Sequence, residues 1–285
     1  MKNEKCKLRN QGAAGSFPLP HSSYFNLQFS IGILQFSIQR CLKPSCRLLS
    51  YTEGDGPHNM AADEALLQSA VHGTASLRFY GWSTATISLG YFQPEQARQD
   101  DARLEPLPFV RRASGGAMLV HHREVTYALA LPPGAPWQTR VSWLRRMHEI
   151  IAVALKEFGI YAHLPDAAKR TLSSGPLCYL QHAPCDLLIE SSKIVGSAQR
   201  KQRGALLQHG GILVSGSPYT PALLGIRELS GRCLTVLETC ASVQRTFAEQ
   251  TGWSLEPGDW TASERQAIAE LAANKYSQDW WNRKR

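Results

Sequence analysis

The spacing of apolar residues along the chain changes between a period of about two and a period of about 3.6, and these periods predict strands and helices. Runs rich in β-branched and aromatic residues, with Gly or Ser at their ends, are typical of strands. Such runs occupy residues 76–80, 86–91, 109–110, 126–131, 187–190, 193–196 and 205–214. Short polar turns at Ser191-Ser192 and near Arg203-Gly204 separate the last three runs, so we expect these to form a three-stranded meander.

Helical spacing recurs in four segments. Asn59 is a polar cap for the first, acidic residues follow it, and apolar residues continue to Leu67, which predicts an amphipathic helix. A second helix fits residues 141–158 and ends at Gly159, and two more are expected at 234–251 and 263–276. Strands and helices in this order predict an α+β fold with a mixed sheet.

The first 46 residues differ in composition from the rest of the chain. A basic start leads into a run at 25–39 that is rich in Ser, Phe and Gln, and its apolar alternation fits a strand or a disordered segment equally well. Glutamines interrupt the run and no small-residue cleavage site follows it, so the pattern does not indicate a signal peptide. We therefore expect an uncertain or disordered N-terminal extension at 1–46 and a single folded domain at 47–285.

Composition and charge narrow the class of protein. The chain has 285 residues, of which 43% are hydrophobic, so it can bury a sizeable core. No apolar run reaches the roughly 18 residues that a membrane-spanning helix needs, and we expect a cytoplasmic location. The net charge of +8 could attract nucleic acid, a membrane surface or an acidic protein. Basic clusters are short and no zinc-finger or helix-turn-helix pattern is evident, so we favour an acidic protein partner.

Seven cysteines are scattered along the chain without the spacing of a disulfide framework, which predicts reduced thiols. Neither Cys178/Cys185 nor Cys233/Cys240 has the CxxC spacing of a structural zinc site. We therefore expect no metal site.

The segment RRASGGAMLVHH, which runs from Arg111 to His122, is the best candidate for chemistry. Gly115 and Gly116 have no Cβ, so the chain there can take positive φ and bring N–H groups close to a carbonyl, carboxylate or phosphate. Arg111 and Arg112 add positive charge with fork geometry. The alternative interpretation is a basic turn at the surface.

Several motifs in one order resemble the biotin/lipoate protein ligase superfamily, from about Arg47 to the C-terminus. They are the helix at 59–67, LRFYGW followed by ATISLGYFQ, the RR-x-S-G-G turn with His121, KIVGSAQR, LQHGGIL and KYSQDWWN. Ala117 stands where lipoate ligases usually carry a third glycine. The resemblance implies a mixed, largely antiparallel sheet flanked by helices. It also implies a catalytic role for Lys193 and substrate binding by Arg111, Arg112, Ser114, Gly115, Gly116, His121, Gly196 and Ser197.

The chain is most similar to the octanoyltransferase branch that looks like the ligases. In that branch a cysteine before the meander takes the acyl group as a thioester, and the spacing of Cys178 from Lys193 matches. A thiolate exchanges with a thioester at little free-energy cost, so no ATP is needed. Lys193 is expected to stabilise the thiolate and polarise the acyl carbonyl, and the glycine turn to hold the oxyanion. An apolar tunnel beside the turn should receive the acyl chain. Cys185 competes as nucleophile, but packing is its favoured role.

The resemblance therefore implies an acyltransferase of lipoate biosynthesis that needs no cofactor. It would move octanoyl from acyl carrier protein to Cys178 and then to a lysine of a lipoyl-domain or glycine cleavage H-type acceptor, with no nucleic-acid or membrane partner. Three alternatives remain open. One is a lipoate-protein ligase that uses ATP and Mg²⁺, although such ligases generally lack the cysteine. The others are an amidotransferase between lipoyl-type proteins and an inactive acyl-protein binding module.

Overall fold

A computed structural model describes residues 43–285, apart from positions 100, 139, 166–176 and 181. These residues belong to one compact unit, Lys43–Arg285. The unit begins shortly before the predicted domain boundary at residue 47, because its first strand starts at Ser45 and buries Cys46. The run at 25–39, for which a strand and a disordered segment were both left open, lies outside the described residues.

The described residues form a seven-stranded sheet and a three-stranded sheet. The large sheet has the order β10-β1-β2-β6-β9-β8-β7, and the small one the order β4-β3-β5. Only β10-β1 and β1-β2 pair in parallel within the large sheet, so the predicted mixed, largely antiparallel sheet is confirmed. The strands are β1 (Ser45–Gly54), β2 (Ser76–Trp82), β3 (Thr86–Leu89), β4 (Phe109–Arg111), β5 (Leu119–His121), β6 (Glu124–Leu131), β7 (Leu187–Ile189), β8 (Ser192–Gln202), β9 (Ala205–Leu213) and β10 (Ser254–Gly258).

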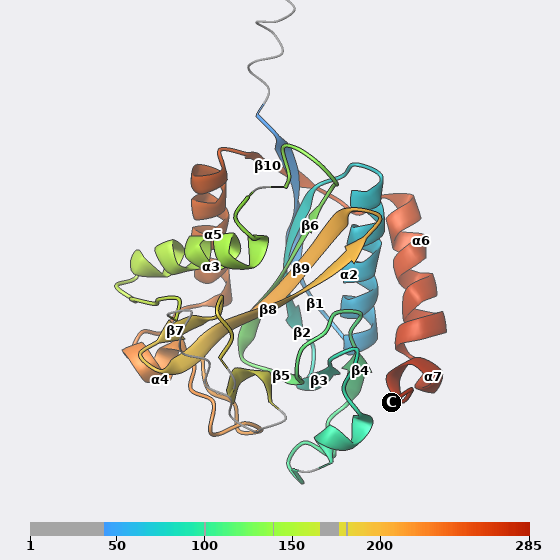
Figure 1. Ribbon diagram of the computed structural model, residues 1–285. Coiled ribbons are helices and arrows are strands. Elements are labelled where there is room, and N and C mark those ends of the chain that lie inside the picture. The colour runs from blue at the N-terminus through green and yellow to red at the C-terminus, as the bar shows by residue number, and fades with distance from the viewer. Residues whose placement is uncertain (1–42, 100, 139, 166–176, 181) are drawn as a thin grey trace, which may run out of the picture. The chain divides into compact units, whose positions relative to one another are not determined.

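Helices cover both faces of the large sheet. In Figure 1, α3 and α5 lie on one side of the strands, and α2 and α6 lie on the other. The α-helices are α2 (Gly56–Val71), α3 (Trp143–Lys156), α4 (Ile226–Ser230), α5 (Val236–Thr251), α6 (Ala262–Leu271) and α7 (Asp279–Asn282). Short turns are η1 (Glu95–Arg98), η2 (Cys178–Leu180) and the π-helical η3 (Ala272–Tyr276). No helix of the described residues combines the length and the apolar character that crossing a membrane requires.

The alternation of side chains along the strands divides the core between the two faces. Leu77 and Phe79 of β2 pack in one cluster with residues of α3 and α5, such as Phe247. Tyr80, the next residue, points to the other face and packs with Leu66 of α2. The strand was predicted from its aromatic residues and its Ser and Gly boundaries, because burial on both faces leaves no alternation of apolar and polar residues in its sequence.

The start of α2 differs from the prediction. Asp55, rather than Asn59, caps the helix, because its side chain accepts a hydrogen bond from the N–H of His58. Asn59 is fully buried, and its amide donates to the carbonyls of Gly54 and Gly81 at the ends of β1 and β2. The prediction of an amphipathic helix was also wrong, because α2 packs between the sheet and α6 and is buried on most sides.

The predicted meander is confirmed. β7, β8 and β9 are neighbours in antiparallel pairing, and Leu188 of β7 lies opposite Lys193 of β8. Glu190 and Arg203 adopt positive φ in the two connecting turns. This hairpin brings Lys193 to the site described next.

Candidate active site

Cys178 and Lys193 meet at one end of the meander. The Nζ of Lys193 lies 3.5 Å from the Sγ of Cys178 and 3.2 Å from its carbonyl oxygen. Cys178 begins the turn η2, where its N–H donates to the carbonyl of Met118 at 2.9 Å. The structure therefore brings together the two residues that the resemblance paired, and their catalytic roles stay a prediction.

Asp186 completes this group, and the sequence analysis missed it. Its Oδ2 lies 2.8 Å from the Nζ of Lys193, and both side chains are almost fully buried. A lysine ammonium has three donor protons and no acceptor, so it can hold the carboxylate and the sulfur together. The predicted meander could have indicated this contact. Asp186 directly precedes β7, and β7 pairs with β8, the strand that carries Lys193.

A narrow cavity lies beside Cys178 and the glycine turn, where the acyl tunnel was expected. It is lined by Met60, Tyr80, Ser88, Arg112, Gly116, Leu119, His121, Thr126, Cys178, Gly196, Ser197, Ala198, His209, Gly210 and Gly211. Five of the predicted binding residues are in this lining: Arg112, Gly116, His121, Gly196 and Ser197. Lys193 reaches Cys178 from a neighbouring hollow, which Tyr179 and His182 also line.

The two arginines of the turn are buried and bind backbone carbonyls. Arg112 donates to the carbonyls of Ser88, Gly115 and Ala117, at 2.9, 3.0 and 2.7 Å. Burial lowers the pKa of Arg112 to about 10, and the charge of Cys178 acts in the opposite direction. Its guanidinium is therefore still a cation at neutral pH, and it lies within electrostatic reach of the thiol.

Arg111 points to the C-terminal helix instead of the cavity. Its guanidinium donates to the carbonyl of Asn282 at 2.9 Å and to that of Gln93 at 2.5 Å, and its N–H donates to the Asn282 side chain at 2.8 Å. The indole of Trp281 donates to the Arg111 carbonyl at 2.7 Å. Arg111 thus anchors the turn to α7, and its substrate-binding role stays a prediction.

The two glycines of the turn are not equivalent. Gly116 has φ +96°, as expected, and a Cβ there would lie 3.0 Å from a guanidinium nitrogen of Arg112. Gly115 is not among the positive-φ glycines, and a Cβ there would meet nothing within 4 Å. Gly196 leaves space for the side chain of Lys193, because a Cβ at position 196 would lie 2.5 Å from the Cε of Lys193. Glycine at this position lets the lysine lie across the strand.

Ser197 is fixed by a chain of hydrogen bonds that the sequence analysis missed. His148 of α3 donates from Nδ1 to the Cys185 carbonyl, and its Nε2 lies 2.6 Å from the Ser197 hydroxyl. Burial lowers the pKa of His148 to about 4, so its imidazole is neutral and Nε2 accepts from Ser197. Tyr127 contacts the same hydroxyl at 2.6 Å. A histidine on the apolar face of α3 was the signal for this buried partner. Cys185, the competing cysteine, contributes its carbonyl to this chain.

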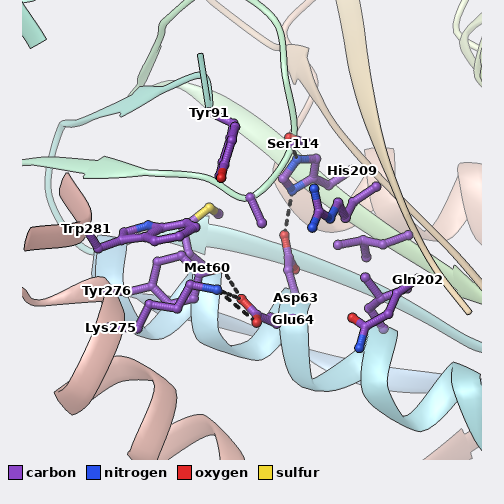
Figure 2. A pocket seen from close by; sticks show the side chains of 14 residues that line it. Met60, Asp63, Glu64, Tyr91, Ser114, Gln202, His209, Lys275, Tyr276 and Trp281 are labelled. Carbon is purple, nitrogen blue, oxygen red and sulfur yellow. Dashed lines mark hydrogen bonds and ion pairs between the residues drawn. The ribbon is translucent and has the colours of Figure 1, made fainter. Parts of the chain in front are cut away.

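Ser114 faces a second cavity. Its hydroxyl lies 2.5 Å from Nε2 of His209, whose Nδ1 donates to Asp63 at 2.8 Å (Figure 2). Glu64 and Lys275 form an ion pair in the wall of this cavity. Met60 and His209 line both cavities and so separate them.

All five cysteines of the described residues are free. These residues contain no group of three or more His, Cys, Asp or Glu side chains that is placed to hold a metal ion.

Residues 55–229 match the family described as "Lipoyl protein ligase A/B catalytic domain". The chain is 34% identical to the octanoyltransferase LipM of Kyrpidia tusciae, over 83% of this chain and 97% of that protein. It is 28% identical to the protein of the same name from Bacillus subtilis, over 85% and 99%. Its fold is similar to that of a lipoate-protein ligase A bound with ATP, with a TM-score of 0.69 and 23% identity over 84% and 98% of the two chains.

The turn provides a matched pair of substitutions. Gly116→Ala should lower the free energy of unfolding by about 1–3 kcal/mol, because alanine is strained at positive φ and its Cβ crowds Arg112. Gly115→Ala should change it by less than about 0.5 kcal/mol. Urea unfolding of both variants checks this difference, and equal losses would contradict the described turn.

His148 should make the protein sensitive to acid. Its pKa is lowered from 6.5 to about 4 in the folded state, so the unfolded chain binds more protons between these values. The free energy of unfolding should therefore fall as the pH drops below about 6.5, and this group alone should remove about 2 kcal/mol by about pH 5. Urea titrations near pH 7 and near pH 5 should show that His148→Gln lacks this part of the decline. An identical decline in variant and wild type would contradict the prediction.

Proposed function

This chain belongs to the family of lipoyl protein ligase A/B catalytic domains, and from that membership we propose that it is an octanoyltransferase of lipoate biosynthesis that carries the acyl group on Cys178. The 3.5 Å approach of the Lys193 ammonium to the Cys178 sulfur is the observation that carries this proposal. A cation at that distance stabilises the thiolate, which is the nucleophilic form of cysteine.

In the first half-reaction the Cys178 thiolate attacks the carbonyl carbon of an octanoyl thioester. A new C–S bond forms at Cys178, the donor's C–S bond breaks, and the donor leaves as a thiolate that takes up a proton. One thioester replaces another, so the step needs neither ATP nor Mg²⁺. Lys193 and Arg112 supply positive charge near the reacting sulfur, and the N–H groups of the turn that contains Gly116, which lines the cavity, are the proposed donors to the oxyanion.

In the second half-reaction a lysine amine of the acceptor attacks the acyl-Cys178 thioester. The C–N bond of an octanoyl amide forms, and the electron pair of the broken C–S bond returns to Cys178. Met60, Tyr80 and Leu119 line the cavity beside Cys178 and provide apolar surface for the acyl chain. Each buried methylene contributes about 0.8 kcal/mol, so such a cavity can select chain length.

Acyl carrier protein is the proposed donor, and lipoyl-domain or glycine cleavage H-type proteins are the proposed acceptors. Both kinds of partner are acidic as families, and the chain carries a net charge of +8. Long-range attraction between opposite charges speeds encounter and weakens as salt is added.

A thioester on Cys178 is directly testable by intact-protein mass spectrometry. Wild type mixed with octanoyl-acyl carrier protein, without ATP, should gain one octanoyl group that hydroxylamine removes. Cys178→Ser should gain no such hydroxylamine-sensitive group. The variant lacks the thiolate that the Lys193 ammonium stabilises, and a serine hydroxyl is a much weaker nucleophile.

Cys185→Ser is the matched control, because both cysteines precede β7 in the chain. Cys185 contributes only its backbone carbonyl to the chain of hydrogen bonds at Ser197. It should be acylated like the wild type. Acceptor modification that requires ATP and free octanoate, with no adduct on the enzyme, would instead make the chain a ligase.

A further inference from the structure

We propose that His121 accepts the proton of the attacking amine in the second half-reaction and that Glu124 is its positioning residue. This assignment rests on the octanoyl transfer proposed above. The attacking nitrogen becomes positively charged as its bond to the acyl carbon forms, so a neutral group near the thioester has to take a proton from it.

His121 is held in one orientation at the wall of the cavity that Cys178 lines. Its Nδ1 lies 2.5 Å from the Glu124 carboxylate, and its Nε2 lies 2.7 Å from the Ser88 hydroxyl. The ring stacks on Trp82, with 3.8 Å between ring centroids and 12° between planes. Stacking and two hydrogen bonds leave the imidazole little freedom to rotate.

The neighbours of this histidine set the direction of its hydrogen bonds. Arg112 can only donate, and it donates to the Ser88 hydroxyl at 3.1 Å. The Ser88 proton is therefore free to point at Nε2 of His121, while Nδ1–H points at the carboxylate of Glu124. In this arrangement Nε2 is the basic atom, and Ser88 lies in the cavity wall beside it.

Glu124 has negative charge available for a protonated imidazole. Its side chain is only 1% exposed, and among the described residues its Oε2 has no hydrogen-bond partner. Its other oxygen accepts from Thr126 at 2.7 Å as well as contacting His121, and no Lys or Arg of the described residues forms an ion pair with it. A buried carboxylate of this kind stabilises a proton arriving on its histidine.

The other basic groups near the cavity are less suited. Lys193 already bridges Cys178 and Asp186 as a proton donor. His209 also has a carboxylate partner, Asp63, but Arg78 forms an ion pair with that carboxylate and offsets its charge. The hydroxyl that His209 contacts, Ser114, lines the second cavity, which Cys178 does not line.

The proton balance of the step is complete with these groups. The amine nitrogen bonds to the acyl carbon and gives up one proton, which passes through the Ser88 hydroxyl to Nε2 of His121. The C–S bond breaks and its electron pair leaves on the Cys178 sulfur. The imidazolium, paired with Glu124, then returns its proton to the thiolate or to solvent when the amide product departs.

Loading of Cys178 and transfer to the acceptor are measured separately, so that the role of His121 is tested independently of the proposed octanoyl transfer. Wild type, His121→Ala, Glu124→Gln and the control His122→Gln are first loaded from octanoyl-acyl carrier protein, and the adduct is measured by mass spectrometry. The loaded proteins are then mixed with a lipoyl domain, and loss of the adduct is timed. Loading should stay within about threefold of wild type in His122→Gln, while in His121→Ala and Glu124→Gln transfer to the acceptor should slow about 100-fold and about 10-fold more than loading does.

Added imidazole should restore part of the transfer rate of His121→Ala, which a purely structural role for the ring does not predict. Transfer at the wild-type rate by His121→Ala, or a slow rate that imidazole leaves unchanged, would overturn the proposal. So would folded His121→Ala and Glu124→Gln proteins that both fail to load. If the wild type itself is not acylated, both the proposed octanoyl transfer and the role of His121 are contradicted.

Discussion

The burial of the Arg112 guanidinium is the constraint on which the site depends. A buried cation is tolerated only when acceptors surround its N–H groups, and those of Arg112 point at Ser88 and at the carbonyls of Gly115 and Ala117. These bonds fix the glycine turn against β3 and orient the hydroxyl beside His121. The same charge acts on Cys178. One side chain therefore shapes the turn and contributes to the electrostatics of the thiol.

The sequence could predict the glycine turn but not which of its side chains face the cavity. Adjacent residues of an extended segment point in opposite directions, so Arg112 lines the cavity while Arg111 reaches α7. Ser114 likewise faces the second cavity. The pairing of Lys193 with Cys178 was expected only from the family resemblance, because the hairpin register places Lys193 opposite Leu188 and does not include Cys178.

Contacts between distant segments account for most of what the sequence could not predict. β1 pairs with β10, which lies near the other end of the chain. Neither strand shows a regular alternation of apolar and polar residues that would predict it. His148 reaches Ser197 from a helix whose apolar period predicts only that its face is buried. Glu124 lies only three residues beyond His121, yet their contact depends on the local path of the chain between β5 and β6.

The proposed mechanism requires the acyl group on Cys178 to be an intermediate and not a side product. The most direct measurement isolates the octanoylated enzyme free of donor and mixes it with an acceptor lipoyl domain in a rapid-quench apparatus, without ATP. The octanoyl group should move to the acceptor lysine at least as fast as the steady-state turnover with donor present. An adduct that survives many turnover times, or that moves only after ATP is added, would contradict this mechanism.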